Sequence, residues 1–325
     1  MKPPTQRGHF PWRWSAPGLL YLAIVIGFSI AAPAFPSIEN ALNILVQMTP
    51  VAIGSLGMTF VLLTAGIDLS VGAVMFLTAA VGGALVVSSG WPVAAAVPMM
   101  LLAGAAAGWA NGCLVTRLGA SAFIVTLATM FVARGAGLWI TQTRAINLPD
   151  VFRGLATGRL GGVPLPVLVL ILAFVSAHIL LTRTPFGRRL YAIGYSRDAA
   201  QTAGLPVGRT ICLAYVISGI CAALAGTVQV SQLAAVSPNL GQGIELEMIA
   251  AAVLGGTSLF GGRGTAAGAI LGAAFVQTVR NGLNLIDADP FIYPIVSGVI
   301  ILLAVLIDSW QQRRESPRRT HMSAA

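Results

Sequence analysis

Apolar residues fill the chain in long runs that are separated by short polar segments rich in Arg, Gly and Pro. A helix that crosses a bilayer needs roughly 20 predominantly apolar residues. The first run, from Pro17 to about Phe35, predicts a retained membrane helix, because it is longer than the apolar core of a signal peptide and lacks a convincing cleavage site. Further helices are predicted at about 44–65, 71–89, 92–116, 121–142, 164–182, 211–232, 246–259, 265–285 and 291–308. The pattern therefore predicts about ten transmembrane helices, several of them rich in glycine and one, 246–259, too short to cross at full thickness.

The composition also indicates a membrane protein. Hydrophobic residues make up 56% of the 325 residues and charged residues 9%, whereas an average soluble domain has about 25% charged residues. So few charged side chains cannot cover a soluble protein of this size. We therefore predict an all-α integral membrane protein and exclude soluble enzymes and disulfide-stapled secreted domains. The net charge of +9 does not indicate a nucleic-acid partner, because the basic residues are dispersed between apolar runs.

Basic residues are distributed unequally between the two sides of the predicted bundle. With an even number of spans both termini lie on one side, and fourteen basic residues share that side: Lys2, Arg7, Arg13, Arg117, Arg183, Arg188, Arg189, Arg197, Arg209, Arg263, Arg313, Arg314, Arg318 and Arg319. The other side has three, Arg144, Arg153 and Arg159. Arg134 and Arg280 are predicted near the outer ends of spans, where they can snorkel. Because cytoplasmic loops are enriched in Lys and Arg, we predict that both termini are cytoplasmic.

A weak internal repeat with an offset of 190 residues relates two parts of the chain. It pairs Met58, Gly66, Leu69, Gly72, Gly82 and Ala84 with Met248, Gly256, Leu259, Gly262, Gly272 and Ala274. Each copy has a polar, glycine-containing break at the same point, although Gly and Ala are abundant enough for chance to supply several matches. We count five spans between the copies and expect opposite topology, as in the inverted repeats that form the central pathway of many transporters.

Nucleotide, metal and catalytic chemistry have no predicted site in the chain. Lys2 is the only Lys and lies in no glycine loop, so the Lys of a Walker A motif is absent. The glycine-rich stretch 256–264 lies between two predicted spans, and a broken-helix turn accounts for it better than phosphate binding. The three cysteines and three histidines have no metal-ligand or catalytic spacing. We therefore predict no catalytic residue and no metal ligand.

The loop 183–210 is the longest predicted cytoplasmic segment and is strongly basic. It contains a serine followed by an acidic-Ala-Ala-xxx-Gly pattern: Ser196, Asp198, Ala199, Ala200 and Gly204. The serine can cap a short helix, the acidic residue favours its first turn, the glycine ends it and Pro206 prevents its continuation. A short exposed helix suits a protein partner, and the alternative is an ordinary solvated basic loop.

Several longer motifs resemble one transporter family. They are 65–72 (AGIDLSVG), 241–246 (GQGIEL), 249–251 (IAA), 253–259 (VLGGTSL), 281–285 (NGLNL) and 301–308 (ILLAVLID). Together with the segment 184–204 they resemble the ribose/xylose-type permeases of bacterial ABC importers, over about residues 44–309. The segment 184–204 resembles the coupling motif of these permeases, with Asp198 where many importers carry Glu, so that the charge is kept.

The resemblance implies a permease domain at 17–309 with cytoplasmic tails at 1–16 and 310–325, a fold like that of type II importers, and a place in the bacterial inner membrane. It implies a dimer with a second copy or a sister permease, surrounded by membrane lipid. Two cytoplasmic ATPase subunits would bind ATP and Mg²⁺ and contact the helix at 196–206, so the permease chain itself needs no cofactor. A soluble binding protein outside would deliver a small-molecule substrate, expected to be a monosaccharide such as ribose or xylose.

A pathway for a neutral sugar should present hydrogen-bonding side chains without strong fixed charge. Polar groups inside spans are costly and face the protein interior or a cavity, and the candidates are Gln47, Asp68, Thr126, Thr129, Gln229, Gln232, Asn281 and Asn284. Asp68 can instead cap the following helix, and Asn281 and Asn284 can instead join helices. Glu245 and Glu247, near the predicted outer mouth, are candidates for docking the binding protein or for a solvated helix start.

Two other transport classes remain as alternatives. A stand-alone secondary transporter needs an ion-coupling site such as paired intramembrane carboxylates, and only Asp68 and Glu247 supply acid there. Importers of branched-chain amino acids or nucleosides have related permeases, but the signature Gly66-Ile67-Asp68-Leu69-Ser70 favours sugars.

Overall fold

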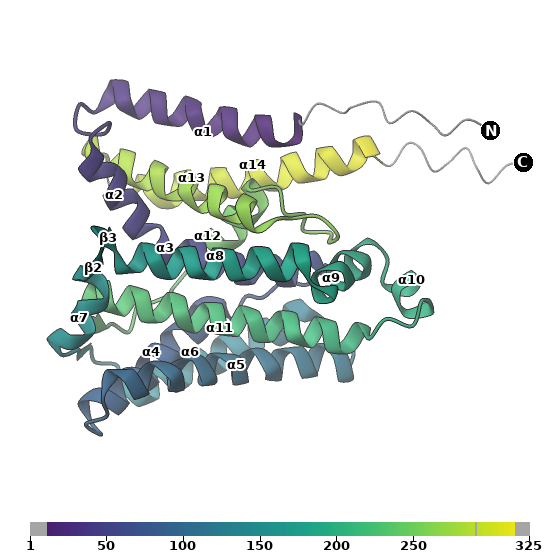
Figure 1. Ribbon diagram of the computed structural model, residues 1–325, viewed down its shortest axis with the longest axis horizontal. Coiled ribbons are helices and arrows are strands. Elements are labelled where there is room, and N and C mark those ends of the chain that lie inside the picture. The colour runs from purple at the N-terminus through teal and green to yellow at the C-terminus, as the bar shows by residue number, and fades with distance from the viewer. Residues whose placement is uncertain (1–11, 290, 316–325) are drawn as a thin grey trace, which may run out of the picture.

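The computed structural model describes residues 12–289 and 291–315, and almost all of its elements are helices (Figure 1). The helices are α1 (Trp12–Ala31), α2 (Ile38–Gln47), α3 (Thr49–Leu63), α4 (Val71–Val87), α5 (Val93–Arg117), α6 (Ala122–Thr141), α7 (Asp150–Thr157), α8 (Leu165–Arg183), α9 (Pro185–Tyr195), α10 (Arg197–Thr202), α11 (Val207–Leu233), α12 (Ile244–Leu254), α13 (Ala266–Leu285) and α14 (Ile292–Glu315). Two antiparallel strand pairs complete the fold, β1 (Ile146–Asn147) with β4 (Ala235–Val236) and β2 (Arg159–Leu160) with β3 (Val163–Pro164). The predicted helical class is confirmed.

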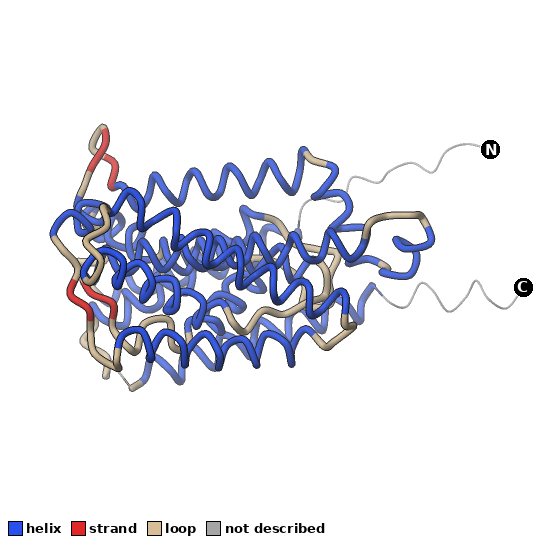
Figure 2. Tube along the Cα trace, turned by 90° about the horizontal axis from the view of Figure 1, so that it is seen from below, coloured by secondary structure: helices blue, strands red, loops and turns tan. Residues whose placement is uncertain are grey.

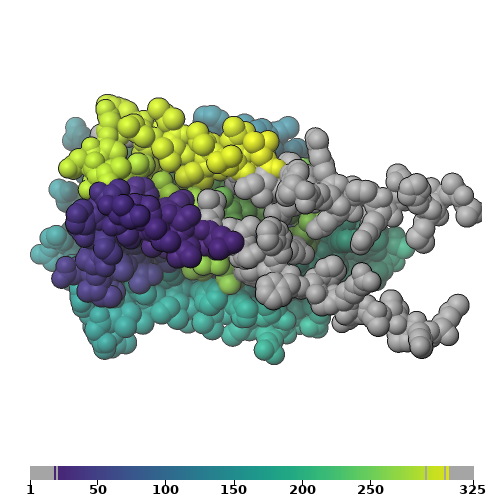
Figure 3. All heavy atoms as spheres, turned by 90° about the horizontal axis from the view of Figure 1, so that it is seen from above, coloured from purple at the N-terminus to yellow at the C-terminus, as the bar shows by residue number. Residues whose placement is uncertain are grey.

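The long helices lie side by side along the long axis of the molecule (Figures 1 and 2). One end carries α7 and the strand pairs, and the other carries α9 and α10 (Figure 1). The start of α1 and the end of α14 point towards the α9–α10 end, and the N-terminal and C-terminal helices cover one face together (Figures 1 and 3). Segments predicted to be cytoplasmic therefore share one end, whereas Arg153 and Arg159, predicted on the other side, lie at the opposite end.

A break at Met48 separates α2 from α3 and bends this pair by 46°. The hydroxyl of Ser37 accepts the Asn40 N–H at 3.2 Å and caps the start of α2. Pro50 has no N–H to continue the hydrogen-bond ladder of α2, which favours the break. Every residue of α3 is buried, so α3 forms the centre of the bundle.

Helices α5 and α11 pack closely against each other through small residues. A Cβ atom added to Gly104 would collide with the carbonyl oxygen of Gly219, and one added to Gly108 would collide with the carbonyl oxygen of Tyr215. Glycine lets two backbones approach where lipid supplies no hydrophobic drive for association. This contact fixes α11 against α5 along much of their length.

Helices occur at all ten predicted positions, but a count of ten full spans is not confirmed. Among the described residues four helices, α5, α6, α8 and α11, are long and apolar enough to cross a membrane, and the bent pair α2–α3 makes a fifth if it is one span. Helix α4 and parts of α1 and α14 are shorter apolar segments, and α12 has only 11 residues. The non-helical stretches around α3 and α12 shorten these elements.

Two helix–turn–helix units, α3–α4 and α12–α13, correspond to the predicted repeat. The Ser55 hydroxyl donates to the Met248 carbonyl at 3.1 Å. Farther along both copies, the Gly262 N–H donates to the Leu63 carbonyl at 2.9 Å. Helices α3 and α12 therefore run in the same direction, and the predicted inverted topology is wrong. The reason is that five long helices, α4, α5, α6, α8 and α11, lie between them, and an odd number of intervening crossings restores the original direction.

The predicted tails are described only in part. Residues 1–11 and 316–325, which include Lys2, Arg7, Arg318 and Arg319, lie outside the described residues. Helix α1 already begins at Trp12 and α14 continues to Glu315. These helices extend past residues 17 and 309, and the domain boundaries predicted there stay predictions.

Candidate transport pathway and coupling surface

The segment 64–70 between α3 and α4 is not helical, and the carboxylate of Asp68 organises it. Asp68 is 2% exposed. Its Oδ1 accepts hydrogen bonds from the backbone N–H of Ser70 at 3.0 Å and from the Ser70 hydroxyl at 2.6 Å. Its Oδ2 accepts the Ser218 hydroxyl of α11 at 2.8 Å. Asp68 therefore ties the start of α4 to α11.

Helices α5 and α6 join the same network. Asn111 of α5 donates to the Ser70 hydroxyl at 2.9 Å and accepts the Thr129 hydroxyl of α6 at 2.6 Å. Thr126, one turn earlier on α6, donates to the Ile67 carbonyl at 3.2 Å. Three predicted pathway residues, Asp68, Thr126 and Thr129, thus belong to one buried cluster that holds the break between α3 and α4.

Asn111 and Ser218 are essential to this cluster, and the sequence reasoning did not single them out. Each is an isolated polar residue in an apolar helix, and its partner lies on another element. The sequence signal that could have identified them is a polar side chain within an apolar span, because such groups face the protein interior. Both oxygens of Asp68 have partners inside the chain, which suits a structural role.

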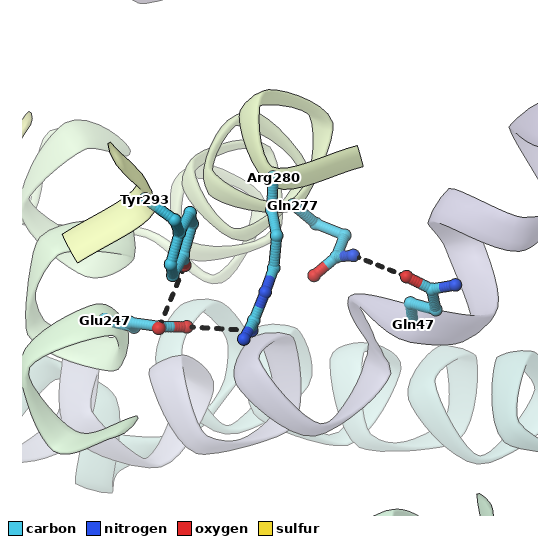
Figure 4. Close-up of polar contacts among 5 residues, drawn as sticks. All are labelled: Gln47, Glu247, Gln277, Arg280 and Tyr293. Carbon is cyan, nitrogen blue, oxygen red and sulfur yellow. Dashed lines mark hydrogen bonds and ion pairs between the residues drawn. The ribbon is translucent and has the colours of Figure 1, made fainter. Parts of the chain in front are cut away.

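A second polar cluster lies on α12, α13 and α14, where Glu247 points between Arg280 and Tyr293 (Figure 4). The Tyr293 hydroxyl is 2.9 Å from Glu247 Oε1, and Arg280 Nη1 is 3.8 Å from Glu247 Oε2. The Arg280 guanidinium also lies 4.6 Å from the centre of the Tyr293 ring. The Arg280 side chain is 50% exposed and that of Glu247 17%. This ion pair is therefore partly exposed at the surface of the molecule.

Two glutamines extend this cluster towards α2 (Figure 4). Gln277 is buried and donates from Nε2 to Oε1 of the exposed Gln47 at 2.9 Å. Gln277, Arg280 and Asn284 are separated by three and four residues, so they share one face of α13. Asn284 is exposed. The sequence predicted Gln47 and Asn284 but missed Gln277 and the pairing of Arg280.

The remaining predicted pathway residues lie elsewhere. Asn281 is buried and exchanges two hydrogen bonds of 2.9 Å with Asn40 of α2. Gln232 donates to the Val46 carbonyl at 3.0 Å. Gln229 is partly buried, and its Oε1 is buried without a hydrogen-bond partner among the described residues. Within residues 12–289 and 291–315 no group of three His, Cys, Asp or Glu side chains could hold a metal ion.

Glu245 has surroundings different from those of Glu247. Its carboxylate packs against Gly72 at the start of α4, and Arg134 of α6 is close enough to interact with it electrostatically. Arg134 also donates to the Leu240 carbonyl at 2.7 Å and lies 4.9 Å from the centre of the Phe76 ring. The two glutamates therefore have different partners. Arg134 and Arg280, predicted near the outer ends of spans, are held by partners within the chain.

Helix α10 has the capping chemistry that the sequence predicted. The Ser196 hydroxyl accepts the Ala199 N–H at 3.2 Å. At the other end the Leu205 N–H bonds to the Ala200 carbonyl at 3.1 Å, and Gly204 has a φ of +73°, which favours glycine. Asp198, Ala199 and Gly204 are exposed, whereas Ala200 is buried beneath the helix. The helix thus presents a small surface at one end of the molecule (Figure 1).

Helix α9 connects α10 to the two breaks inside the bundle. The Tyr191 hydroxyl donates to the Gly264 carbonyl at 2.8 Å. Gly194 lies so close to the Leu63 carbonyl and the Gly262 backbone nitrogen that a Cβ atom there would collide with both. A displacement of α9 must therefore move the end of α3 and the turn 255–265 together, because packed backbone cannot deform continuously.

Comparison with known proteins identifies the family. The family model described as the permease component of the branched-chain amino acid transport system matches residues 40–305. The chain belongs to this permease family. It is 42% identical over 294 residues to the ribose import permease protein RbsC of Bacillus subtilis, and this alignment covers 90% of each chain. It is 38% identical over 298 residues to RbsC of Haemophilus influenzae, covering 89% of this chain and 92% of the relative.

A further relative extends the range of sugars. The xylose transport system permease protein XylH of Escherichia coli strain K12 is 34% identical over an alignment of 357 positions, gaps included, with 90% of this chain and 91% of the relative covered. No solved structure is significantly similar to the chain. The resemblance to ribose/xylose-type permeases that the motifs indicate is confirmed.

Proposed function

We propose that the chain is the membrane-spanning permease subunit of an ATP-driven importer for a monosaccharide. The observation that carries the proposal is its similarity, over about nine-tenths of its length, to ribose and xylose import permeases. ATP hydrolysis then belongs to a separate subunit, in keeping with a sequence whose only Lys lies in no glycine loop. The chain itself is not an enzyme.

The ATPase subunits dock on α9 and α10 and bind the ATP and Mg²⁺. This part of the proposal is supported by the position of α10, which lies at one end of the molecule with Asp198 and Ala199 exposed. Closure of the ATPases pushes on α10, and the contacts of α9 with Gly262, Gly264 and Leu63 carry the movement to both breaks. The substrate's own binding energy cannot drive accumulation, so the ATPase must supply it.

The solute passes along the polar face formed by α2, α12 and α13, which a second permease copy covers. Gln47, Arg280 and Asn284 are exposed there, although polar groups facing lipid are costly. Covering this face removes that cost and leaves hydrogen-bonding groups for sugar hydroxyls. The partner chain is either an identical copy or a sister permease.

The other predicted pathway residues support this face in different ways. Asp68, Thr126 and Thr129 hold the α3–α4 break, and Asn281 fixes α13 to α2 through Asn40. The unpaired Oε1 of Gln229 and the amide of Gln232 remain pathway candidates on α11.

The binding protein docks on the end that carries α7 and the strand pairs (Figure 1). Because Glu247 is engaged by Arg280 and Tyr293, we expect Glu247 to influence docking by holding α12 against α13 and α14. Glu245 acts similarly where α12 meets α4. Both glutamates therefore position the surface that receives the substrate.

The protein lies in the bacterial inner membrane as a multi-pass protein, with both termini in the cytoplasm. Four or five apolar helices of membrane length among the described residues support the membrane location. The orientation is supported by the basic loop 183–210 and by the ends of α1 and α14, which share one end of the molecule.

The test is transport by the reconstituted complex with its ATPase and binding protein. Vesicles containing the complex are given labelled ribose, xylose, leucine or adenosine together with internal or external ATP. We expect ATP-dependent uptake of a pentose, and we expect it only when the ATP is on the side of the membrane that the basic end faces. Uptake of leucine without any sugar uptake would favour the amino acid alternative, which the family description names. Uptake of adenosine alone would favour the nucleoside alternative.

A further inference from the structure

A groove of about 510 Å³ lies between α5 and α11 and has an arginine on each wall. Arg117 is the last residue of α5, and Arg209 lies in the first turn of α11, so both mark the end of the molecule that carries α9 and α10. Both side chains are exposed, and among the described residues neither forms an ion pair with a carboxylate. The mouth of the groove therefore carries two uncompensated positive charges.

The rest of the groove is apolar and faces outward. Trp109, 54% exposed, and Leu213, 50% exposed, line opposite walls. Trp109 precedes Arg117 by eight residues, which corresponds to about 12 Å along a helix. Val216 follows Arg209 by seven residues and lines the other wall over a similar length. The groove thus passes from a cationic mouth to an apolar interior along the direction of the helices.

The floor of the groove is open because Gly208 has no side chain to fill it. The nearest atom that a Cβ at Gly208 would meet is Thr116 Cβ, at 3.7 Å. Cys212 lies one turn farther along α11 and also lines the groove. Small residues on both walls therefore leave room for a chain that lies parallel to the helices.

We propose that this groove binds one anionic phospholipid. Its phosphate lies between Arg117 and Arg209, and an acyl chain lies along Trp109, Leu213 and Val216. Guanidinium groups bind phosphate in charge-assisted pairs, and basic pockets between membrane helices suit anionic headgroups. A free phosphate ion has no apolar part that could contact the apolar length of the groove. The site goes beyond the proposed transport function, and only its assignment to the inner leaflet rests on the proposed orientation.

The experiment measures lipid binding to the purified full chain by native mass spectrometry, with phosphatidylglycerol and phosphatidylcholine of identical acyl chains. We expect one phosphatidylglycerol to bind at least about tenfold more tightly than phosphatidylcholine, because each arginine near a headgroup contributes attraction. Equal affinity for the two lipids overturns the proposal. Excess inorganic phosphate should not displace the lipid, and displacement would assign the arginines to free phosphate instead.

Variants separate the two parts of the site. Arg117→Gln/Arg209→Gln should weaken phosphatidylglycerol binding at least about tenfold, whereas Arg144→Gln/Arg159→Gln, which removes the same charge at the opposite end, should not change it. Arg117→Lys/Arg209→Lys should retain binding, which guards against misfolding as the cause of a loss.

Filling the groove tests the apolar part without changing charge. Gly208→Phe should reduce phosphatidylglycerol binding, because the ring fills the groove beside Thr116, where the lipid enters. If Gly208→Phe removed a dimer from the mass spectrum and left lipid binding unchanged, the groove would be a contact with a second copy. The lipid proposal would then be wrong.

Discussion

Gly262 donates its backbone N–H to the carbonyl of Leu63 at 2.9 Å, which joins the turn after α12 to the end of α3. These residues are about 200 positions apart in the chain. Gly194 of α9 packs directly on this bond, since a Cβ there would collide with both partners. The connection makes one mechanical unit of both breaks and of the helix that precedes α10.

Replacing Gly194 with Ala should disrupt this unit. The added methyl group forces backbone apart, and overpacking of this kind costs about 1–3 kcal/mol. We expect loss of sugar uptake and of substrate-stimulated ATP hydrolysis while the protein still inserts in the membrane. The control is Gly135→Ala in α6, where an added Cβ meets nothing within 4 Å. Equal uptake by both variants would contradict the mechanical role of Gly194.

Asp68→Ala should destabilise the permease more than Asp68→Asn. Alanine leaves the Ser70 N–H and the Ser218 hydroxyl without an acceptor, and each buried unsatisfied group costs about 1–3 kcal/mol. Asparagine keeps one carbonyl oxygen and adds a donor that can meet the serine oxygen. Thermal unfolding in detergent measures the difference. Similar midpoints for the two variants would show that the network does not hold the break.

Changes in α10 should separate insertion from transport. Gly204→Pro cannot adopt the φ of +73° that ends this helix, and Asp198→Arg reverses the charge of its first turn. Both should abolish uptake and leave the amount of protein in the membrane unchanged. Asp198→Glu, which keeps the negative charge in the first turn of α10, is the control. Normal transport by the α10 variants would remove the case for coupling at this helix.

The face of α13 should affect substrate handling. Gln277→Leu breaks the 2.9 Å bond to Gln47, and Asn284→Leu removes an exposed hydrogen-bonding group. We expect each to lower the uptake rate at low sugar concentration roughly 5- to 30-fold, since a lost hydrogen bond costs about 1–2 kcal/mol. Ser176→Leu, an exposed polar-to-apolar change on α8, is the matched control. A response no larger than that of the control would exclude α13 from the pathway.

The Glu247–Arg280 pair allows a charge-swap test. Either Glu247→Arg or Arg280→Glu places like charges about 4 Å apart on a partly exposed face. Each single variant should lose transport, and the double variant Glu247→Arg/Arg280→Glu should recover part of it. Uptake by the double variant that equals the product of the two single losses would show that the residues act independently.

Local signals in the sequence allowed some features to be predicted. The capped α10 follows from Ser196, which accepts the N–H of Ala199 three residues later, and from Gly204, whose N–H bonds to the Gln201 carbonyl three residues earlier. The apolar runs also gave the positions of the helices. These features depend on residues that are close together in the sequence, so the order of residues is enough to predict them.

Features that depend on tertiary contacts could not be predicted in the same way. Ser218 meets Asp68 across 150 positions and Asn111 meets Ser70 across 41. No local pattern shows which apolar helices approach, so the pathway candidates separated into a buried network and an exposed face only in the structure. The direction of the repeat was predicted wrongly although the count of five intervening spans was right, because an odd number of crossings restores the original direction.

The most direct test of the account compares two sets of vesicles, one with the permease alone and one with the permease, its ATPase and its binding protein. We predict that labelled ribose or another monosaccharide accumulates against its gradient only in the second set and only with ATP. Accumulation against a gradient by the permease alone would contradict the claim that this chain is a gate driven by a separate ATPase.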